Sequence, residues 1–317
     1  MLGPVRDPAT GALVTTPLAK SAVSADLDLD LTAKQIWPGI GEAMTGVTAK
    51  LSARAGELTL DEVVGSWLGG TMTGRLSVAN TDGSGFLQSR LDLSGADVGR
   101  SLNALRIDRG LDPANVLSGT YDMTFVGEGG GASAAELIGG ASGSGAVTLP
   151  RLAIRDLDLT ILPRLVAEAD ALGTDLDQDK VRAMTDTLSS SGETVVEGLK
   201  LPFALSDHTI RVQNAVVQTG PAALDGSARL DLESGTLDGE IGVALSAGDF
   251  AMDGAAPNLR LLLQGEALAP ERVLDVTELT NFLSLRAFER ERRRVEALQS
   301  SVLEKQRLRR EAALARA

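Results

Sequence analysis

The chain contains no cysteine, one histidine and few aromatic residues, and each shortage argues against a class of function. Without cysteine there can be no disulfide, no thiolate metal site and no cysteine nucleophile. His208 alone cannot supply a zinc site built from several histidines or an HExxH motif. Phe, Trp and Tyr together make up 3% of the residues, so the protein is poorly equipped to stack nucleic-acid bases.

Long apolar runs are also missing. No stretch of the sequence reaches about 18 consecutive apolar residues, so no segment predicts a helix that crosses a membrane. The first 20 residues lack the apolar core of a signal peptide and indicate an irregular lead-in. We therefore expect any targeting or anchoring segment to lie upstream of this sequence.

Charge is distributed unevenly along the chain. The total is −13, but residues 289–317 hold nine basic and five acidic side chains, which makes this stretch +4 and the remainder −17. The acidic body would repel nucleic-acid phosphates, so we expect no nucleic-acid partner. The basic end suits a membrane surface with anionic headgroups or an envelope protein, and it is equally typical of a solvated surface helix.

Short segments of alternating polarity dominate the body. Leu27, Leu29 and Leu31 alternate with aspartates, which predicts a strand with one apolar and one wet face. Similar segments continue to residue 264, separated by turns such as Asp82-Gly83, and predict an antiparallel meander. The predicted fold class is mainly β with α: an elongated, curved antiparallel sheet that forms an open groove, with a few packing helices and a long carboxy-terminal helix.

Helical spacing of apolar residues predicts short helices at residues 96–107, 133–138, 157–172 and 177–188. A Thr-x-x-Glu capping box at Thr59 and Glu62 predicts another over residues 59–68. Residues 271–317 lack Pro and Gly and are dense in Arg, Glu and Leu, which predicts one long charged helix. We thus divide the chain into a lead-in (1–20), a β domain (21–270) with a helical insert near 157–190, and a terminal helix (271–317).

The familiar catalytic and metal motifs are incomplete. Asp26, Asp28 and Asp30 have the opening spacing of a calcium loop, but the Gly and Glu required further on are missing. The glycines of residues 127–131 lack the Lys-Ser/Thr pair of a phosphate loop. His208 lies between two strand-like segments, which indicates a turn residue. We expect no catalytic residue, no metal site, no cofactor and no enzymatic activity.

Three stretches resemble the AsmA family and its TamB-like relatives. The first combines a Ser-Gly-Thr strand at 117–125, a Gly-rich segment with a short helix, a Gly-x-Gly strand at 143–149 and an aliphatic-acidic run at 154–159. The second spans the strands at 202–217 and 224–232 and the Gly-Thr-Leu-Asp turn at 235–238, and the third is the helical segment 282–291. The resemblance covers residues 85–296. The amino-terminal membrane anchor and most of the upstream repeats of that family are absent.

This resemblance implies a periplasmic protein without enzymatic activity, anchored to the inner membrane by an upstream segment. It would take part in phospholipid transport between membranes and in outer-membrane assembly, with phospholipid or another acyl lipid as its partner.

The residues themselves also favour a lipid partner, because an apolar sheet face must be covered by something. Burying an acyl chain of about sixteen carbons gains on the order of 10 kcal/mol before entropy losses. The candidate lipid-binding residues are Leu27, Leu29, Leu31, Leu91, Leu93, Leu230, Leu232, Ile241, Val243, Leu259, Leu261 and Leu263. The alternative is a structural or interaction protein of the cell envelope, in which these residues form a core, the sheet is closed, and the basic terminal helix binds a partner.

Overall fold

The computed structural model describes residues 26–54, 56–81 and 83–314, so the predicted lead-in lies outside the described residues. Its main feature is one antiparallel sheet of thirteen strands, in which each strand pairs with its neighbours in sequence. The strands are β1 (Leu27–Ile36), β2 (Met44–Arg54), β3 (Glu57–Trp67), β4 (Gly70–Thr81), β5 (Ser84–Asp97), β6 (Leu117–Gly131), β7 (Ser142–Arg155), β8 (Glu193–Ser206), β9 (Thr209–Gln218), β10 (Ala222–Asp231), β11 (Thr236–Leu245), β12 (Asn258–Glu266) and β13 (Glu271–Asp275). The helices are α1 (Val98–Asp108), α2 (Ala134–Gly139), α3 (Leu162–Leu172), α4 (Gln178–Ser189) and α5 (Thr277–Leu314), with 3-10 turns η1 (Gly173–Asp175) and η2 (Gly248–Phe250).

Tight turns explain why the strands pair in sequence order. Between β8 and β9, Asp207 and His208 have φ values of 47° and 57°, as both central residues of a primed hairpin turn require. Gly83, with φ of 93°, lies in the turn between β4 and β5. His208 is therefore a turn residue, as the sequence predicts.

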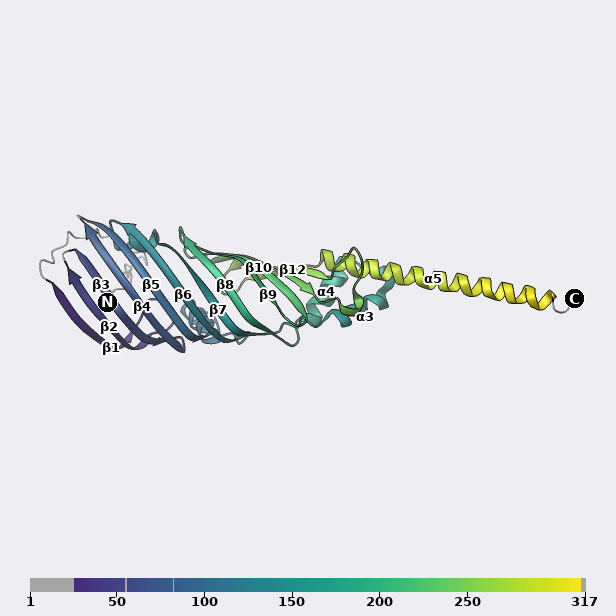
Figure 1. The fold of residues 1–317 in the computed structure, drawn as a ribbon, viewed down its shortest axis with the longest axis horizontal. Helices are drawn as coiled ribbons and strands as arrows, with labels where there is room; N and C mark the ends of the chain where they lie inside the picture. Colours follow the sequence, from purple (N-terminus) through teal and green to yellow (C-terminus); the bar gives the residue numbers. More distant parts are fainter. Residues whose placement is uncertain (1–25, 55, 82, 315–317) are drawn as a thin grey trace.

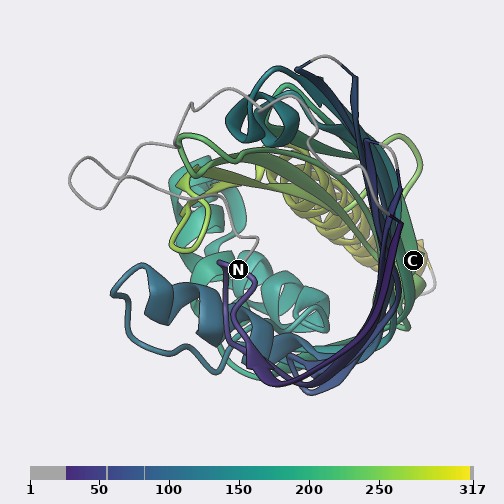
Figure 2. The same cartoon turned by 90° about the vertical axis from the view of Figure 1, so that its left-hand side faces the viewer.

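The sheet is open and curved, which confirms the predicted fold class. Figure 1 shows the strands side by side along the long axis of the molecule, with α5 projecting beyond the last of them. Figure 2, a view along that axis, shows the sheet curling into an incomplete ring with helices on its concave side. Since β1 and β13 each have only one paired neighbour, the ring is not closed by hydrogen bonds between its edge strands.

The predicted helix at residues 59–68 is wrong, because this segment is strand β3. It pairs on one side with β2, where Thr59 opposes Ser52, and on the other with β4, where Thr59 opposes Ser77. Backbone bonds to two neighbouring strands outweigh the local capping signal of Thr59 and Glu62. Val63 and Val64 also favour a strand because they are β-branched.

The terminal helix begins later than the sequence predicts. Residues Glu271–Asp275 form strand β13, in which Leu274 opposes Leu261 of β12. The Asp275 carboxylate then accepts hydrogen bonds from the backbone N–H of Thr277 at 3.0 Å and from its hydroxyl at 2.6 Å. These bonds satisfy donors at the start of α5, so the helix runs for 38 residues, or about 57 Å.

Helices cover the two ends of the strands on the concave side. α3, α4 and the first turns of α5 pack on β10 to β12 and bury Leu165, Val181 and Phe282 completely. α1 covers a second buried cluster around Leu93 and Ala96 at the end of β5. α2 lies against β6, where a methyl group on Gly129 would meet the Leu137 carbonyl oxygen at 2.1 Å. Most of the helical cover therefore lies over the strand ends and the last strands.

The distal part of α5, residues Glu291 to Glu311, projects away from the rest of the described structure (Figure 1). All described side chains from Glu291 to Glu311 are exposed, including Val295, Leu298 and Val302. Within the described part of the chain, no helix combines the length and hydropathy needed to span a membrane.

Candidate functional site

Strand register gathers the aliphatic residues on the concave face. Directly opposed residues in an antiparallel sheet point to the same face, so one row of pairs can be followed from β1 to β12. We call it the central row. It consists of Leu29, Leu51, Leu60, Leu76, Ser89, Gly127, Gly143, Leu205, Ile210, Leu230, Leu237 and Gly265.

The central row is mainly apolar, and its aliphatic members lie outside the buried clusters formed by the described residues. Eight of its twelve members are Leu or Ile, and none of these eight belongs to a buried cluster. Leu29 is 43% exposed, and Leu205 and Leu230 are half-buried. At about 4.8 Å per strand, the row is about 50 Å long. The hydrocarbon core of a whole bilayer is about 30 Å thick, so the row is longer than an acyl chain.

Aromatic rings lie over glycines in the middle of this face. Phe125 and Phe203 stack with ring centroids 6.1 Å apart and planes within 6°. A methyl group on Gly145 would lie 2.5 Å from Phe203 Cζ, and one on Gly127 would lie 2.6 Å from Phe125 Cζ. The glycines therefore let the rings lie flat along the strands, an arrangement that protects the glycine backbone and smooths the apolar surface.

The predicted lipid-binding residues lie on the concave face, but in different surroundings. Leu27, Leu29, Leu31 and Leu232 are exposed by 39–46%. The half-buried members are Leu91, Leu230, Ile241, Leu261 and Leu263.

Leu93, Val243 and Leu259 are 2–7% exposed and lie in buried clusters, so these three belong to the core and not to the open surface. The reason is tertiary, because α1 packs over Leu93 while α3, α4 and α5 pack over the other two.

Charged side chains occupy the opposite, convex face. There Arg75 pairs with Asp61 at 3.0 Å, and Arg260 pairs with Glu240 at 2.9 Å. The hydrogen bond that the Lys50 ammonium donates to the Glu62 carboxylate raises the pKa of Lys50. Separating charge from the aliphatic face leaves the concave side with little that would repel a hydrocarbon chain.

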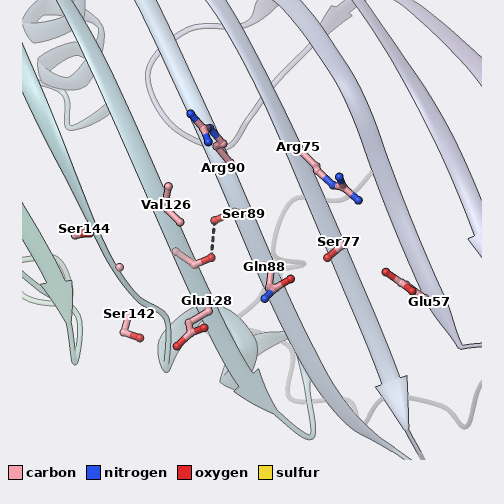
Figure 3. A pocket seen from close by; sticks show the side chains of 12 residues that line it. Glu57, Arg75, Ser77, Gln88, Ser89, Arg90, Val126, Glu128, Ser142 and Ser144 are labelled. Atoms are coloured by element: carbon pink, nitrogen blue, oxygen red, sulfur yellow. Dashed lines mark hydrogen bonds between the residues drawn. The ribbon is translucent and has the colours of Figure 1, made fainter.

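The convex face carries a polar hollow of about 690 Å³, formed over β3 to β7 (Figure 3). Arg75, Arg90 and Glu128 line it together with Ser77, Ser142 and Ser144. Polar side chains spread over a broad surface, with no apolar enclosure, give little shape for a small ligand.

One ionisable group on the concave side is held neutral. Tyr121 lies beneath α1, where its hydroxyl is 3.0 Å from the Ser101 hydroxyl. Burial raises the pKa of Tyr121, and a hydrogen bond from Ser101 opposes that change. The residue therefore contributes an uncharged polar contact within an apolar layer.

Asp28, one of the three aspartates with the opening spacing of a calcium loop, is engaged by a neighbouring strand. Its carboxylate accepts hydrogen bonds from the Arg54 guanidinium at 2.7–2.8 Å. Across the described ranges, no three His, Asp or Glu side chains are close enough to hold a metal ion. Sequence reasoning missed the paired phenylalanines, although the signal lies in the sequence as Phe125 and Gly127 on β6, Gly143 and Gly145 on β7, and Phe203 on β8.

Comparisons with known proteins add no relative, since no family model, curated protein or solved structure matches this chain.

Proposed function

We propose that the protein is a non-enzymatic lipid-handling factor that shelters the acyl chains of phospholipids on its concave face. The supporting observation is the central row, a mainly aliphatic strip about 50 Å long that is interrupted at Ser89, Gly127 and Gly143 and that the helices leave uncovered. Exposed apolar areas of this extent are unusual on a soluble protein and are typical of interaction surfaces.

The energetics agree with a lipid as the covering group. Each buried methylene gains about 0.8 kcal/mol, so a chain of about sixteen carbons gains on the order of 10 kcal/mol before entropy losses. Because Leu and Ile members of the row occur on both sides of its middle, a chain can lie at several positions along it. This property suits transport more than storage at one fixed position.

The cellular setting rests on the resemblance to the AsmA family. On that basis we propose a periplasmic location, anchorage to the inner membrane by a segment upstream of this sequence, and a role in phospholipid transport between membranes and outer-membrane assembly.

The test is extraction and mass spectrometry of lipid from the protein purified without detergent. We expect phospholipid in a stoichiometric amount, because the uncovered strip would otherwise face water. Leu205→Asp should lower the bound amount several-fold, since a carboxylate in the central row disfavours hydrocarbon contact.

The matched control is Val126→Asp, which places the same charge on the convex face. Val126 is 56% exposed and lies opposite Arg90 in the neighbouring strand. It should fold normally and retain its lipid. Lipid-free protein that remains a stable monomer, or equal lipid loss in both variants, would contradict the proposal.

A second candidate function concerns the distal part of α5. The sheet is open, so the predicted alternative is wrong in requiring a closed one. Its other half, a partner for the terminal helix, is favoured by the uncovered apolar side chains of this segment. Leu303 is 65% exposed and Leu298 is 56% exposed, while the stretch as a whole is basic. A pull-down with envelope extracts, comparing the full chain with one ending at residue 290, would test whether this helix recruits a protein.

A further inference from the structure

Besides the polar hollow of the convex face, the molecule has an apolar hollow where distant parts of the chain meet at the rim of the sheet. It encloses about 670 Å³, within the range of small-ligand sites. One wall is formed by Ile210 and Leu230 of the central row, and another by Trp37 and Ile40 of the loop between β1 and β2. We call this hollow the rim pocket. Ile210 and Leu230 belong to the concave face, whereas Trp37 and Ile40 are exposed to solvent. The rim pocket therefore connects the concave face with solvent.

The walls of the rim pocket are held in place by hydrogen bonds. The backbone N–H of Gly41 donates to the Asp108 carboxylate at 2.6 Å, which ties the loop to the end of α1. Next to it, Glu42 accepts from the Leu68 N–H at 2.9 Å and pairs with Arg100 at 2.8 Å.

α1 in turn contacts the turn after β12, where Arg106 donates to the Leu268 carbonyl. The first and last thirds of the chain are thus joined at this pocket, on either side of the opening.

The apolar wall residues are unusually exposed. Trp37 is 64% exposed, Ile40 is 52% exposed and Leu232 is 46% exposed. These three side chains lie around one opening together with Leu105 of α1. A ligand with hydrocarbon would bury all of them at once, at about 25 cal/mol per Å² of apolar surface.

The charged groups of the rim pocket favour a headgroup that carries both signs. Arg109 is on its lining, and its guanidinium makes no hydrogen bond or ion pair with any described residue. Asp108, Asp231 and Glu266 also line the pocket. The Asp231 carboxylate accepts the Ser234 N–H at 2.8 Å, whereas that of Glu266 has no side-chain partner among the described residues. One free cation and an excess of carboxylates suit a phosphate accompanied by an amine.

We propose that the rim pocket is a lateral entry site for a phospholipid with a zwitterionic, amine-bearing headgroup. Arg109 binds the phosphate, Glu266 faces the ammonium, and the acyl chains enter past Trp37 and Ile40 onto Ile210 and Leu230. A net anionic phospholipid is disfavoured by the surrounding carboxylates. This site rests on the proposed function, because it assumes that the concave face accepts acyl chains.

Trp37 allows the site to be tested separately from lipid binding in general. The full chain is titrated with phosphatidylethanolamine carrying short brominated acyl chains, below its critical micelle concentration, and tryptophan emission is recorded. Bromine quenches only on contact, and the other tryptophan, Trp67, is half-buried against the cluster under α1 and does not line the rim pocket. We expect saturable quenching that disappears in Trp37→Phe.

Two variants test the charges. Arg109→Gln should raise the concentration for half-maximal quenching about tenfold, the effect of losing one charge-assisted hydrogen bond. Arg90→Gln, which removes an arginine from the convex face, should leave it unchanged. Phosphatidylglycerol with the same brominated chains should require at least about ten times more lipid, and glycerophosphoethanolamine, which has no acyl chains, should not compete.

The outcomes separate the two proposals. If unlabelled lipid co-purifies but brominated lipid leaves Trp37 emission unchanged, the entry site is wrong and the concave face still binds lipid. If neither occurs, both proposals fail. If phosphatidylglycerol quenches Trp37 at the same concentration as phosphatidylethanolamine, or if Arg109→Gln leaves that concentration unchanged, the headgroup assignment is overturned. If glycerophosphoethanolamine competes, the pocket binds the headgroup without the acyl chains, and the entry site is wrong.

Discussion

An aspartate at Leu230 should be tolerated, whereas the same change at Leu259 should not. Both leucines lie on the concave face, two strands apart. Leu230 is half-buried in the central row, and Leu259 is 7% exposed in the cluster beneath α5. The comparison therefore measures whether the central row is open in solution.

The expected magnitudes follow from burial. Full burial of a leucine is worth about 1.5–3 kcal/mol, so the partly exposed Leu230 should lose about 1 kcal/mol. The weaker strand preference of aspartate adds less than about 1 kcal/mol, which gives a total below about 2 kcal/mol. Leu259→Asp loses nearly the full burial energy and also places a carboxylate in a packed core, so its cost should exceed about 4 kcal/mol.

Urea denaturation at pH 7, followed by far-ultraviolet circular dichroism, measures both free energies of unfolding. An unchanged dependence on urea concentration would show that the two variants expose similar surface on unfolding. Equal destabilisation by the two substitutions would refute the reasoning, because it would mean that Leu230 is covered in solution as fully as Leu259.

Three further predictions concern stability. Gly145→Ala should destabilise the protein by about 1–3 kcal/mol in the same urea assay, because the added methyl group meets the Thr124 backbone oxygen at 2.2 Å and also displaces the Phe203 ring, and an unchanged midpoint would contradict this packing. Phe282→Ala should lower the free energy of unfolding by about 3–5 kcal/mol, because this side chain is fully buried. A chain that ends at residue 290 should keep the melting temperature of the full chain. A large drop in melting temperature on truncation would show that distal α5 packs in solution. Hydrogen bonds from the hydroxyl and N–H of Thr277 hold the pKa of Asp275 below its usual value. The ionised Asp275 therefore stabilises the folded protein at pH values above the ordinary aspartate pKa. This stabilisation is lost as the pH falls through the lowered pKa of the folded state. Between pH 7 and pH 3, the free energy of unfolding should therefore change less with pH in Asp275→Asn than in the wild-type protein. The same pH dependence in both proteins would exclude the effect.

Much of the fold could be predicted from local patterns. The alternation of Leu and Asp in β1 needs only the two-residue period of a strand, and the turn at Asp207 and His208 needs only residues that tolerate positive φ. The charged end of the chain predicts helix because it lacks Pro and Gly and is rich in helix-forming residues. These signals lie within a few residues of each other, so no knowledge of distant contacts is required.

The errors occurred where a distant partner decided the outcome. Residues 59–68 contain a capping box, yet they form β3 because strands on both sides offer backbone hydrogen bonds. Likewise, Glu271 begins a strand because β12 has a free edge, and only then does the chain turn into α5.

Taken alone, the sequence determined that this protein builds a long antiparallel meander with one aliphatic face, because alternation along a strand is a local property of the chain. Only the tertiary structure decided which leucines on that face are covered. Leu93 and Leu29 have the same pattern in the sequence, but α1 packs over the first, while the second is 43% exposed among the described residues. The rim pocket likewise exists because the curvature of the sheet brings Trp37 and Leu268 to one opening, and that curvature sums small twists over all thirteen strands.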